Sequence, residues 1–394
     1  MKTIKVKGII YMKNAETVSC PILYNPKPED YDEKSREYQG CPSIAITENG
    51  RIFVAWYAGG FNEPHMDNYN LVHYSDDNAE TWSDMCLVIP SSRELLIHAL
   101  DIQLWMDPEN RLHVFWVQNN VEKAAVHNSP EDFGRKIEGE DGVYVDGYYF
   151  NDKQHSEWEI VCENPDADTL VFSKPRFLFH GFLRCKPLVL ANGAYLYFNY
   201  NQLCDRYAYS LSYDKGKTFK NFYGGKKIRT PYDETMAYQM EDLSVRMFAR
   251  TAEGFIAESV SKDNALTFSD GKPTDILNPD SRFYISKLPS GRVLLINNDH
   301  NKVREMMTAY LSEDDGKTWK YKNCINANDH TTYPDAEIHN GTVYLIYDHE
   351  RTKAKEIILC RFTEEDIINN RHITEQIISK AYGKILDWDV DIDD

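Results

Sequence analysis

Alternating apolar and polar residues, interrupted by short turns, fill most of the chain. Five segments share this pattern closely and begin with CPSIAITENG, ALDIQLWMDP, CKPLVLANGA, RFYISKLPSG and YPDAEIHNGT. In each, an apolar run leads through a turn into a second apolar run, as in two antiparallel strands joined by a hairpin. A less regular copy, EDLSVRMFARTAEGFIAESVS, turns around Glu253-Gly254. The sequence therefore predicts six hairpin units, which begin near residues 41, 98, 184, 241, 282 and 333.

An eight-residue motif recurs four times after these hairpins. It reads Ser-x-Asp-x-Ala/Gly-x-Thr-Trp/Phe and starts at Ser75, Ser212, Ser261 and Ser312. Ser and Asp side chains can satisfy the N–H groups of a turn, and Gly or another small residue takes the unusual backbone dihedral. Each motif therefore predicts a tight turn, and the repetition predicts an array of similar units.

Units of about 40–60 residues with four strands each are typical of a β-propeller, because one blade cannot bury both of its faces. We expect an all-β protein, a six-bladed β-propeller that spans residues 1–394 as a single domain. The long gap between the motifs at Ser75 and Ser212 leaves room for an insertion at about 119–180. A short helix from Thr363 and an acidic tail are expected at 363–394, and a strand at 3–12 is expected to close the ring.

The composition narrows the range of partners. The chain has 62 Asp and Glu against 44 Lys and Arg, a formal net charge of -18, which argues against nucleic acid and membrane surfaces as partners. It has no apolar run long enough to span a membrane and no recognisable signal peptide, so we expect a cytoplasmic protein, or a secreted one whose signal has been removed. The cysteines and histidines lack metal-binding spacing, so no metal or other cofactor is expected.

The candidate catalytic and binding residues lie at the predicted strand starts. In a propeller the innermost strands start at one end of the channel, so residues at these starts converge. Most of the predicted starts carry polar or titratable residues, and we expect these to line one pocket: His98, Asp101, Arg184, Lys186, Glu241, Arg282, Tyr333 and Asp335.

The four motifs are Asp-boxes, and together with the six hairpin units they resemble the sialidase (neuraminidase) superfamily over nearly the whole chain. The segment TTYPDAEIHNGTVYLIYD is similar to the stretch that carries the family's nucleophilic tyrosine, which implies that role for Tyr333. By the same resemblance Glu241 matches the glutamate that activates the tyrosine. Asp67, in the loop before the first Asp-box, matches the acid/base aspartate.

The chain departs from the family pattern at the arginines. Family members hold the substrate carboxylate with three arginines, and the first lies in a Phe/Tyr-Arg-Ile-Pro motif where this chain has Gly-Cys-Pro-Ser at 40–43. The second is expected near 255–258, where no arginine stands. Arg304 matches the third, and the other candidate anion ligands are Arg282, Arg184 and Lys186.

The resemblance implies an exo-glycosidase that removes a terminal acidic or modified sugar from a glycan or oligosaccharide. A neutral tyrosine suits such a substrate, because a carboxylate nucleophile would be repelled by a carboxylate on the anomeric carbon. Two alternatives stay open: a polysaccharide lyase acting on uronate-containing glycans, and a non-catalytic carbohydrate-binding propeller. A homo-oligomer is compatible with the sequence.

Overall fold

The computed structural model describes residues 15–385 except 231 and 233. Its first sheet has the strand order β1-β5-β4-β3-β2. These strands are β1 (Leu23–Tyr24), β2 (Tyr38–Ile46), β3 (Ile52–Gly59), β4 (Tyr69–Ser75) and β5 (Leu87–Pro90), with the 3-10 helix η1 (Pro28–Tyr31) between β1 and β2. The expected strand at 3–12 lies outside the described residues.

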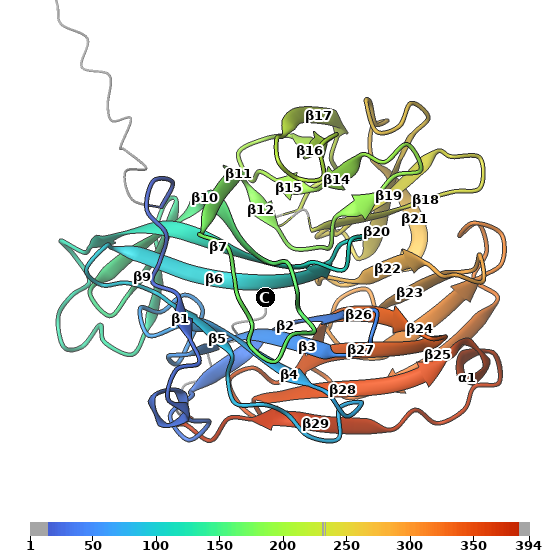
Figure 1. The fold of residues 1–394 in the computed structure, drawn as a ribbon. Coiled ribbons are helices and arrows are strands. Elements are labelled where there is room, and N and C mark those ends of the chain that lie inside the picture. The colour runs from blue at the N-terminus through green and yellow to red at the C-terminus, as the bar shows by residue number, and fades with distance from the viewer. Residues whose placement is uncertain (1–14, 231, 233, 386–394) are drawn as a thin grey trace, which may run out of the picture.

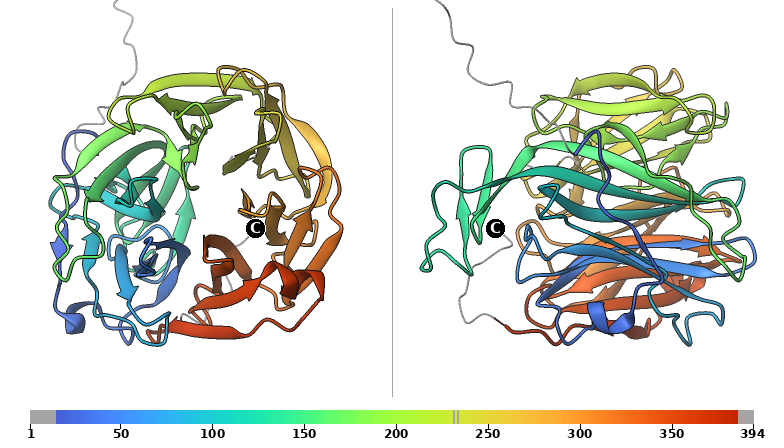
Figure 2. Two further views of the ribbon diagram at one scale, coloured as in Figure 1. Left: turned by 45° about the vertical axis from the view of Figure 1, so that its right-hand side comes forward. Right: turned by 60° about the vertical axis from the view of Figure 1, so that its left-hand side comes forward.

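The second sheet has the order β6-β7-β10-β9-β8, and β11 also pairs with β10. Its strands are β6 (Ile97–Met106), β7 (Leu112–Lys123), β8 (Lys136–Glu138), β9 (Gly142–Val145), β10 (Tyr148–Cys162) and β11 (Arg176–His180). The insertion expected at 119–180 is therefore largely part of this sheet. Only the part that contains β8 and β9 projects from the body of the molecule, as the right-hand view of Figure 2 shows.

The third sheet has the order β13-β14-β16-β17, and the strands β12 and β15 form a separate pair. These strands are β12 (Phe182–Leu183), β13 (Leu188–Val189), β14 (Tyr195–Tyr197), β15 (Asn199–Tyr200), β16 (Arg206–Ser212) and β17 (Lys220–Lys226). The fourth sheet consists of β18 (Thr235–Gln239), β19 (Val245–Ala249), β20 (Phe255–Ser261) and β21 (Lys272–Leu277).

The last two sheets also contain four strands each, paired in sequence order. The fifth consists of β22 (Tyr284–Lys287), β23 (Val293–Asn298), β24 (Met307–Ser312) and β25 (Tyr321–Asn326). The sixth consists of β26 (Thr331–His339), β27 (Thr342–His349), β28 (Glu356–Thr363) and β29 (Glu375–Lys380). The short helix α1 (Glu364–Ile368) follows Thr363 as expected, and the Asp366 carboxylate accepts a hydrogen bond from the Thr363 N–H at 2.8 Å. Among the described residues, no helix has the length and apolarity needed to cross a membrane.

The sheets are arranged in a ring, as Figure 1 and the left-hand view of Figure 2 show. Strand β2 contacts β6 on one side and β26 on the other, and β22 contacts both β18 and β26. The first full strand of each of these sheets therefore lies nearest the axis. This arrangement confirms the predicted all-β propeller.

The core is divided among the seams between neighbouring sheets. The largest cluster of buried apolar residues extends from the second to the sixth sheet. A second lies between the first two sheets, and a third lies where the first and last sheets meet. At that closure the Gln39 N–H donates to the Arg351 carbonyl at 3.1 Å and the Cys41 N–H donates to the Asp348 carboxylate at 2.6 Å. Each sheet therefore buries apolar side chains against its neighbours, which favours the closed ring.

The four Asp-box motifs form turns with the same hydrogen bonds. In each, the Ser hydroxyl donates to the Asp carboxylate at 2.8 Å and accepts the N–H of the residue four positions later. That residue has a positive φ: 66° at Ala79, 78° at Gly216, 62° at Ala265 and 74° at Gly316. The hydrogen bonds from the Thr and Ser residues lower the pKa of Asp77, Asp214 and Asp314 to about 2.

These turns should depend on the buried Ser hydroxyl. Ser312 is fully buried, and its hydroxyl accepts the Gly316 N–H at 2.8 Å. Ser312→Ala leaves that N–H without its acceptor, so the free energy of unfolding should fall by about 1–3 kcal/mol. Ser35→Ala removes an exposed hydroxyl and should change it by less than about 0.5 kcal/mol. Chemical denaturation of both variants measures the difference, and equal effects would contradict the assignment.

Candidate active site

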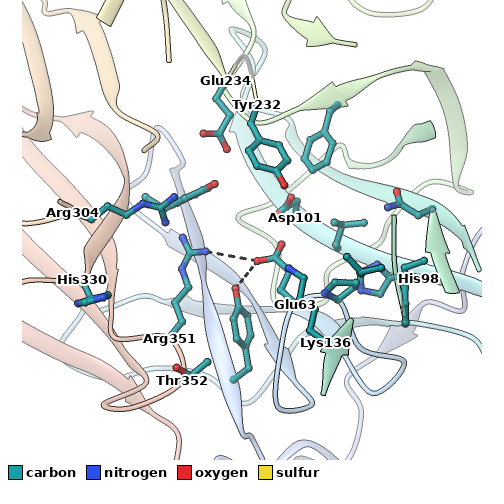
Figure 3. A pocket seen from close by; sticks show the side chains of 18 of the residues that line it. Glu63, His98, Asp101, Lys136, Tyr232, Glu234, Arg304, His330, Arg351 and Thr352 are labelled. Atoms are coloured by element: carbon teal, nitrogen blue, oxygen red, sulfur yellow. Dashed lines mark hydrogen bonds and ion pairs between the residues drawn. The ribbon is translucent and has the colours of Figure 1, made fainter. Parts of the chain in front are cut away.

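One cavity of about 190 Å³ is lined by residues from all six sheets or the loops next to them. The first sheet contributes Tyr38 and the loop residue Glu63, and the second contributes His98 and Asp101. Further polar residues that line it include Tyr232, Glu234, Arg250, Arg304, His330, Tyr333, Arg351 and Lys353. Figure 3 shows Arg304 and Arg351 on one side of this cavity and His98 and Lys136 on the opposite side. The ring therefore brings polar residues from distant parts of the chain to one place.

Three inner strands share a local irregularity beside the cavity. The pairing register shifts between residues 40 and 43 in β2, between 100 and 103 in β6, and between 332 and 335 in β26. A non-glycine residue with positive φ lies at each shift: Cys41 at 55°, Asp101 at 49° and Tyr333 at 54°. Bulges of this kind re-aim side chains, and left-handed backbone costs of order 1–2 kcal/mol per residue. Left-handed backbone is therefore present where Asp101 and Tyr333 enter the cavity.

Tyr333 lies among guanidinium groups. Arg250 donates a hydrogen bond to the Tyr333 hydroxyl at 3.2 Å. The Arg351 guanidinium carbon lies 4.2 Å from the centre of the Tyr333 ring, and that of Arg184 lies 5.4 Å from it. Burial, followed by the charge of Glu234, raises the pKa of Tyr333, and Arg250 opposes this shift. The phenol is therefore neutral near pH 7 and needs a base to become a nucleophile.

Glu234 is the carboxylate placed next to this phenol. It lies just before β18 and is 4% exposed. The same Arg250 nitrogen that reaches Tyr333 donates to the Glu234 carboxylate at 2.9 Å. Burial alone would raise the pKa of Glu234, but Arg250 and Arg184 outweigh it, and the pKa is lowered. Glu234 is therefore an ionised base held beside a neutral phenol.

The structure does not bring Glu241 to Tyr333, and the predicted placement of Glu241 was wrong. Glu241 is exposed in the turn between β18 and β19, outside the cavity, and its N–H donates to the Asp315 carboxylate at 3.2 Å. The hairpin at Glu253-Gly254 joins the second and third strands of this sheet, whereas the first turn, at 240–244, contains no glycine. The predicted strand start therefore corresponds to β19, and Glu234 stands at the start of the inner strand β18.

Asp67 also lies outside the cavity, contrary to expectation. Its side chain is 57% exposed and pairs with Arg93 at 2.6 Å. Glu63, on the same loop, reaches the cavity instead. Its carboxylate accepts the Tyr38 hydroxyl at 2.7 Å and lies 3.7 Å from Arg351, as the dashed lines in Figure 3 show.

Asp101 faces Glu63. Ligand atoms of Cys41, Glu63 and Asp101 all lie within 4.8 Å of one another. Burial raises the pKa of Asp101 to about 7, with a further contribution from the charge of Glu63 against the opposing charge of Arg184. The spacing of this trio suits a metal ion, but guanidinium groups already lie 3.7 Å from each carboxylate. Asp101 and Glu63 therefore each already have a positively charged partner.

The other predicted ligands divide into two groups. His98, Asp101 and Arg304 line the cavity as expected. Burial lowers the pKa of His98 to about 3, so it is neutral, and its Nε2 lies 2.6 Å from the Tyr57 hydroxyl. Contrary to expectation, the remaining four do not line the cavity. They belong to a largely buried charged network: Arg184, Lys186, Arg282 and Asp335.

That network connects several sheets behind the cavity. The Asp335 carboxylate accepts the Ser43 hydroxyl at 2.7 Å and lies 3.6 Å from the Lys186 ammonium and 3.5 Å from the Arg282 guanidinium. Arg184 is 1% exposed and lies 3.7 Å from Asp101. Each of these cations lies near a carboxylate from another sheet, so we assign the network a structural role in connecting the sheets.

Two arginines of the cavity were not predicted. Arg250 follows β19, and Arg351 lies in the loop between β27 and β28. Arg351 donates to Asp348 at 3.1 Å and to the Thr332 hydroxyl at 3.0 Å. A Cβ atom on Gly40 would lie 2.8 Å from Arg351 side-chain carbons. The segment that lacks the expected arginine therefore leaves the space through which Arg351 enters from the last sheet.

Aromatic and aliphatic side chains also line the cavity. Phe182 and Tyr200 stack with ring centres 5.0 Å apart, and Leu100 lies in the same apolar cluster. The projecting part of the second sheet adds Lys136, Val143 and Phe150. The cavity thus offers both guanidinium groups and aromatic faces.

A β-propeller with this polar cavity among its inner strands is the class that the fold and site define. The model of the BNR repeat-like domain matches residues 50–345, and the chain belongs to that family. No curated protein sequence matches the chain significantly.

Solved structures share the fold at low sequence identity. The intramolecular trans-sialidase from Ruminococcus gnavus is 14% identical with a TM-score of 0.64, covering 89% of this chain and 98% of that one. The NanB sialidase from Streptococcus pneumoniae is 14% identical with a TM-score of 0.60, covering 89% and 68%. A protein of unknown function from Dyadobacter fermentans is 15% identical with a TM-score of 0.58, covering 81% and 92%.

The raised pKa of Asp101 should appear in the pH dependence of stability. An aspartate has a pKa near 3.9 when unfolded and about 7 here. Its contribution to stability is therefore full below about pH 4 and is lost as the pH rises through 7. Asp101→Asn removes this dependence, so the wild type should lose stability relative to the variant between about pH 4 and 7. Denaturation of both proteins across this range measures the difference, and parallel curves would contradict the raised pKa.

Proposed function

We propose that this protein is a sialidase-like glycoside hydrolase that removes a terminal acidic sugar from a glycan or oligosaccharide. In this proposal each of the six sheets is one blade, with the β12 and β15 pair belonging to the third. The observation that carries the proposal is the bridge in which one Arg250 nitrogen contacts both the Tyr333 hydroxyl and the Glu234 carboxylate.

The arginines support an anionic substrate. Arg250, Arg304 and Arg351 line the same cavity in a chain whose formal net charge is -18. These three arginines are therefore a local cluster of positive charge in an acidic protein. Guanidinium groups offer planar, paired donors that match a carboxylate. The acidic group of the sugar is proposed to lie between these three arginines, with the sugar ring toward the aromatic side chains.

Tyr333 is the proposed nucleophile. Glu234 accepts the phenol proton as the oxygen bonds to the anomeric carbon, and a glycosyl-tyrosine forms while the leaving oxygen departs. Water then attacks the same carbon and releases the sugar and the phenol. A neutral phenol avoids the repulsion that an anionic nucleophile would meet from the sugar's own acidic group.

The pair of Glu63 and Asp101 is the proposed acid. Two carboxyl groups this close disfavour double ionisation, so one of them retains a proton near neutral pH. A pKa of about 7 at Asp101 suits a group that protonates a leaving oxygen and then accepts a proton from water. In this proposal Glu63 and Asp101, which line the cavity, take the acid/base role that the sequence predicted for Asp67.

The lyase alternative uses many of the same groups. In a lyase an arginine would neutralise a uronate and Glu234 would deprotonate the Tyr333 phenol. The phenolate would then take the proton next to the carboxylate as the C–O bond to the leaving sugar breaks, which leaves a C=C bond in the product. Residues from every sheet or an adjacent loop surround the cavity, and the projecting part of the second sheet forms one of its walls. This enclosure favours the end of a sugar chain over the middle of a polymer. Ultraviolet absorbance of the product separates the two reactions, because hydrolysis forms no C=C bond.

The catalytic assignment predicts that substitutions inside the cavity reduce kcat, whereas substitutions of the exposed carboxylates do not. Glu234→Gln and Tyr333→Phe should each reduce kcat by at least about 100-fold, because each removes a participant in nucleophile formation. Glu241→Gln and Asp67→Asn alter exposed groups outside the cavity and should leave kcat within about twofold. Hydrolysis of aryl sialosides and aryl uronides measures these rates. Full turnover by Tyr333→Phe would refute the nucleophile.

The arginine assignment predicts an effect on binding that depends on substrate charge. Arg351→Met keeps the length of the side chain but removes the guanidinium. KM for an acidic aryl glycoside should rise by about 10- to 100-fold, corresponding to about 1.4–2.8 kcal/mol. Arg229→Met removes an exposed guanidinium that pairs with Glu253 at 3.5 Å outside the cavity, so it is the matched control and should have a small effect. Equal changes in the two variants would argue against a specific anion contact at Arg351.

A further inference from the structure

A second cavity, of about 490 Å³, lies away from the candidate active site. It is lined by η1 and the segment after it, by β3, β4 and the turn that follows the first Asp-box, and by β29 at the outer edge of the molecule (Figure 1). No residue lines both cavities. Whatever enters this groove is therefore bound independently of the Tyr333 chemistry.

Aromatic rings form much of the groove. Trp56 and His73 stack with their ring centres 5.2 Å apart and an angle of 22° between the rings. Tyr31 and Trp82 complete the aromatic lining, and Trp82 is the last residue of the first Asp-box. The indole N–H groups of Trp56 and Trp82 have no hydrogen-bond acceptor among the described residues. Buried indole N–H groups usually find a partner, so two such groups beside one cavity point to a ligand that brings acceptors.

His73 adds an acceptor to these donors. Its Nδ1 lies 2.8 Å from the Ser83 carbonyl oxygen, which can only accept, so Nδ1 carries the proton. Burial lowers the pKa of His73 to about 4, so the ring is neutral at pH 7. Nε2 is therefore a lone-pair acceptor.

The charged residues of the groove restrict the class of ligand. Four carboxylates line it, and the one guanidinium, that of Arg36, already donates to Tyr69, Gln39, Ser379 and the Tyr31 carbonyl. An anionic sugar would be repelled by this lining. A cation would suit the carboxylates but would leave the indole N–H groups without acceptors. Sugar hydroxyls both donate and accept, and the C–H face of a pyranose packs against aromatic rings.

We propose that this groove is a second glycan-binding site, selective for a neutral sugar unit. The active-site cavity would hold the acidic end of a glycan, and the groove would hold an uncharged sugar of the same or another chain. The groove would bind neutral sugars even if the propeller had no hydrolase activity, so it is tested separately from the proposed function.

The experiment uses the full chain and neutral disaccharides as probes, namely lactose, cellobiose and maltose. Saturation-transfer NMR and tryptophan fluorescence titrations measure binding. The variant Trp82→Phe removes one indole N–H but keeps the packing, since Phe219 and Phe268 occupy the same position in the second and third Asp-boxes. Loss of one neutral hydrogen bond should weaken binding by about fivefold. Trp319→Phe, the same change in the fourth Asp-box, should have no effect.

Several outcomes would overturn the proposal. One is the absence of binding by all three disaccharides in the wild type. Another is an equal loss in Trp82→Phe and Trp319→Phe. Binding of a lysine peptide in place of sugars would assign the groove to a cationic partner. Tyr333→Phe should bind the disaccharides like the wild type, and a loss there would place the binding in the active-site cavity instead.

Discussion

Compensation of buried positive charge is the constraint on which the candidate site depends. Arg184 and Arg250 are nearly inaccessible to solvent, and both lie beside the Tyr333 phenol. Burying a guanidinium is costly unless carboxylates accompany it. Glu234 lies near both arginines, and Asp101 and Asp280 each pair with one of them. These carboxylates come from different strands and loops, so the electrostatic balance of the site requires the whole ring to close.

Closure also explains how strained backbone persists at the site. Cys41, Asp101 and Tyr333 hold positive φ at matching bulges in β2, β6 and β26. Neighbouring inner strands pack against one another and fix these bulges through contacts such as the Cys41 N–H to Asp348. Substrate binding would then require little rearrangement of the phenol and the acid, which is how preorganised sites reduce the barrier to reaction.

The sequence was most informative where local patterns repeat. The four Asp-boxes and the hairpins predicted the propeller, and the segment around Tyr333 placed that residue in the cavity. Glu234 could not be recognised, because the turn after β18 lacks glycine and the strand start was assigned to Glu241. Arg351 could not be recognised either, because it enters from a loop of the last sheet into space left by Gly40. Local sequence patterns reveal turns and strands, whereas contacts between distant sheets depend on ring closure.

The proposed chemistry turns on whether Tyr333 forms a bond to the sugar. The most direct measurement is mass spectrometry of the protein after reaction with a fluorinated acidic-sugar fluoride, a reagent that forms the glycosyl-enzyme quickly and releases it slowly. The account predicts one sugar attached to the peptide that contains Tyr333, and no attachment in Glu234→Gln under the same conditions. Attachment at Glu63 or Asp101 would contradict the account and make a carboxylate the nucleophile.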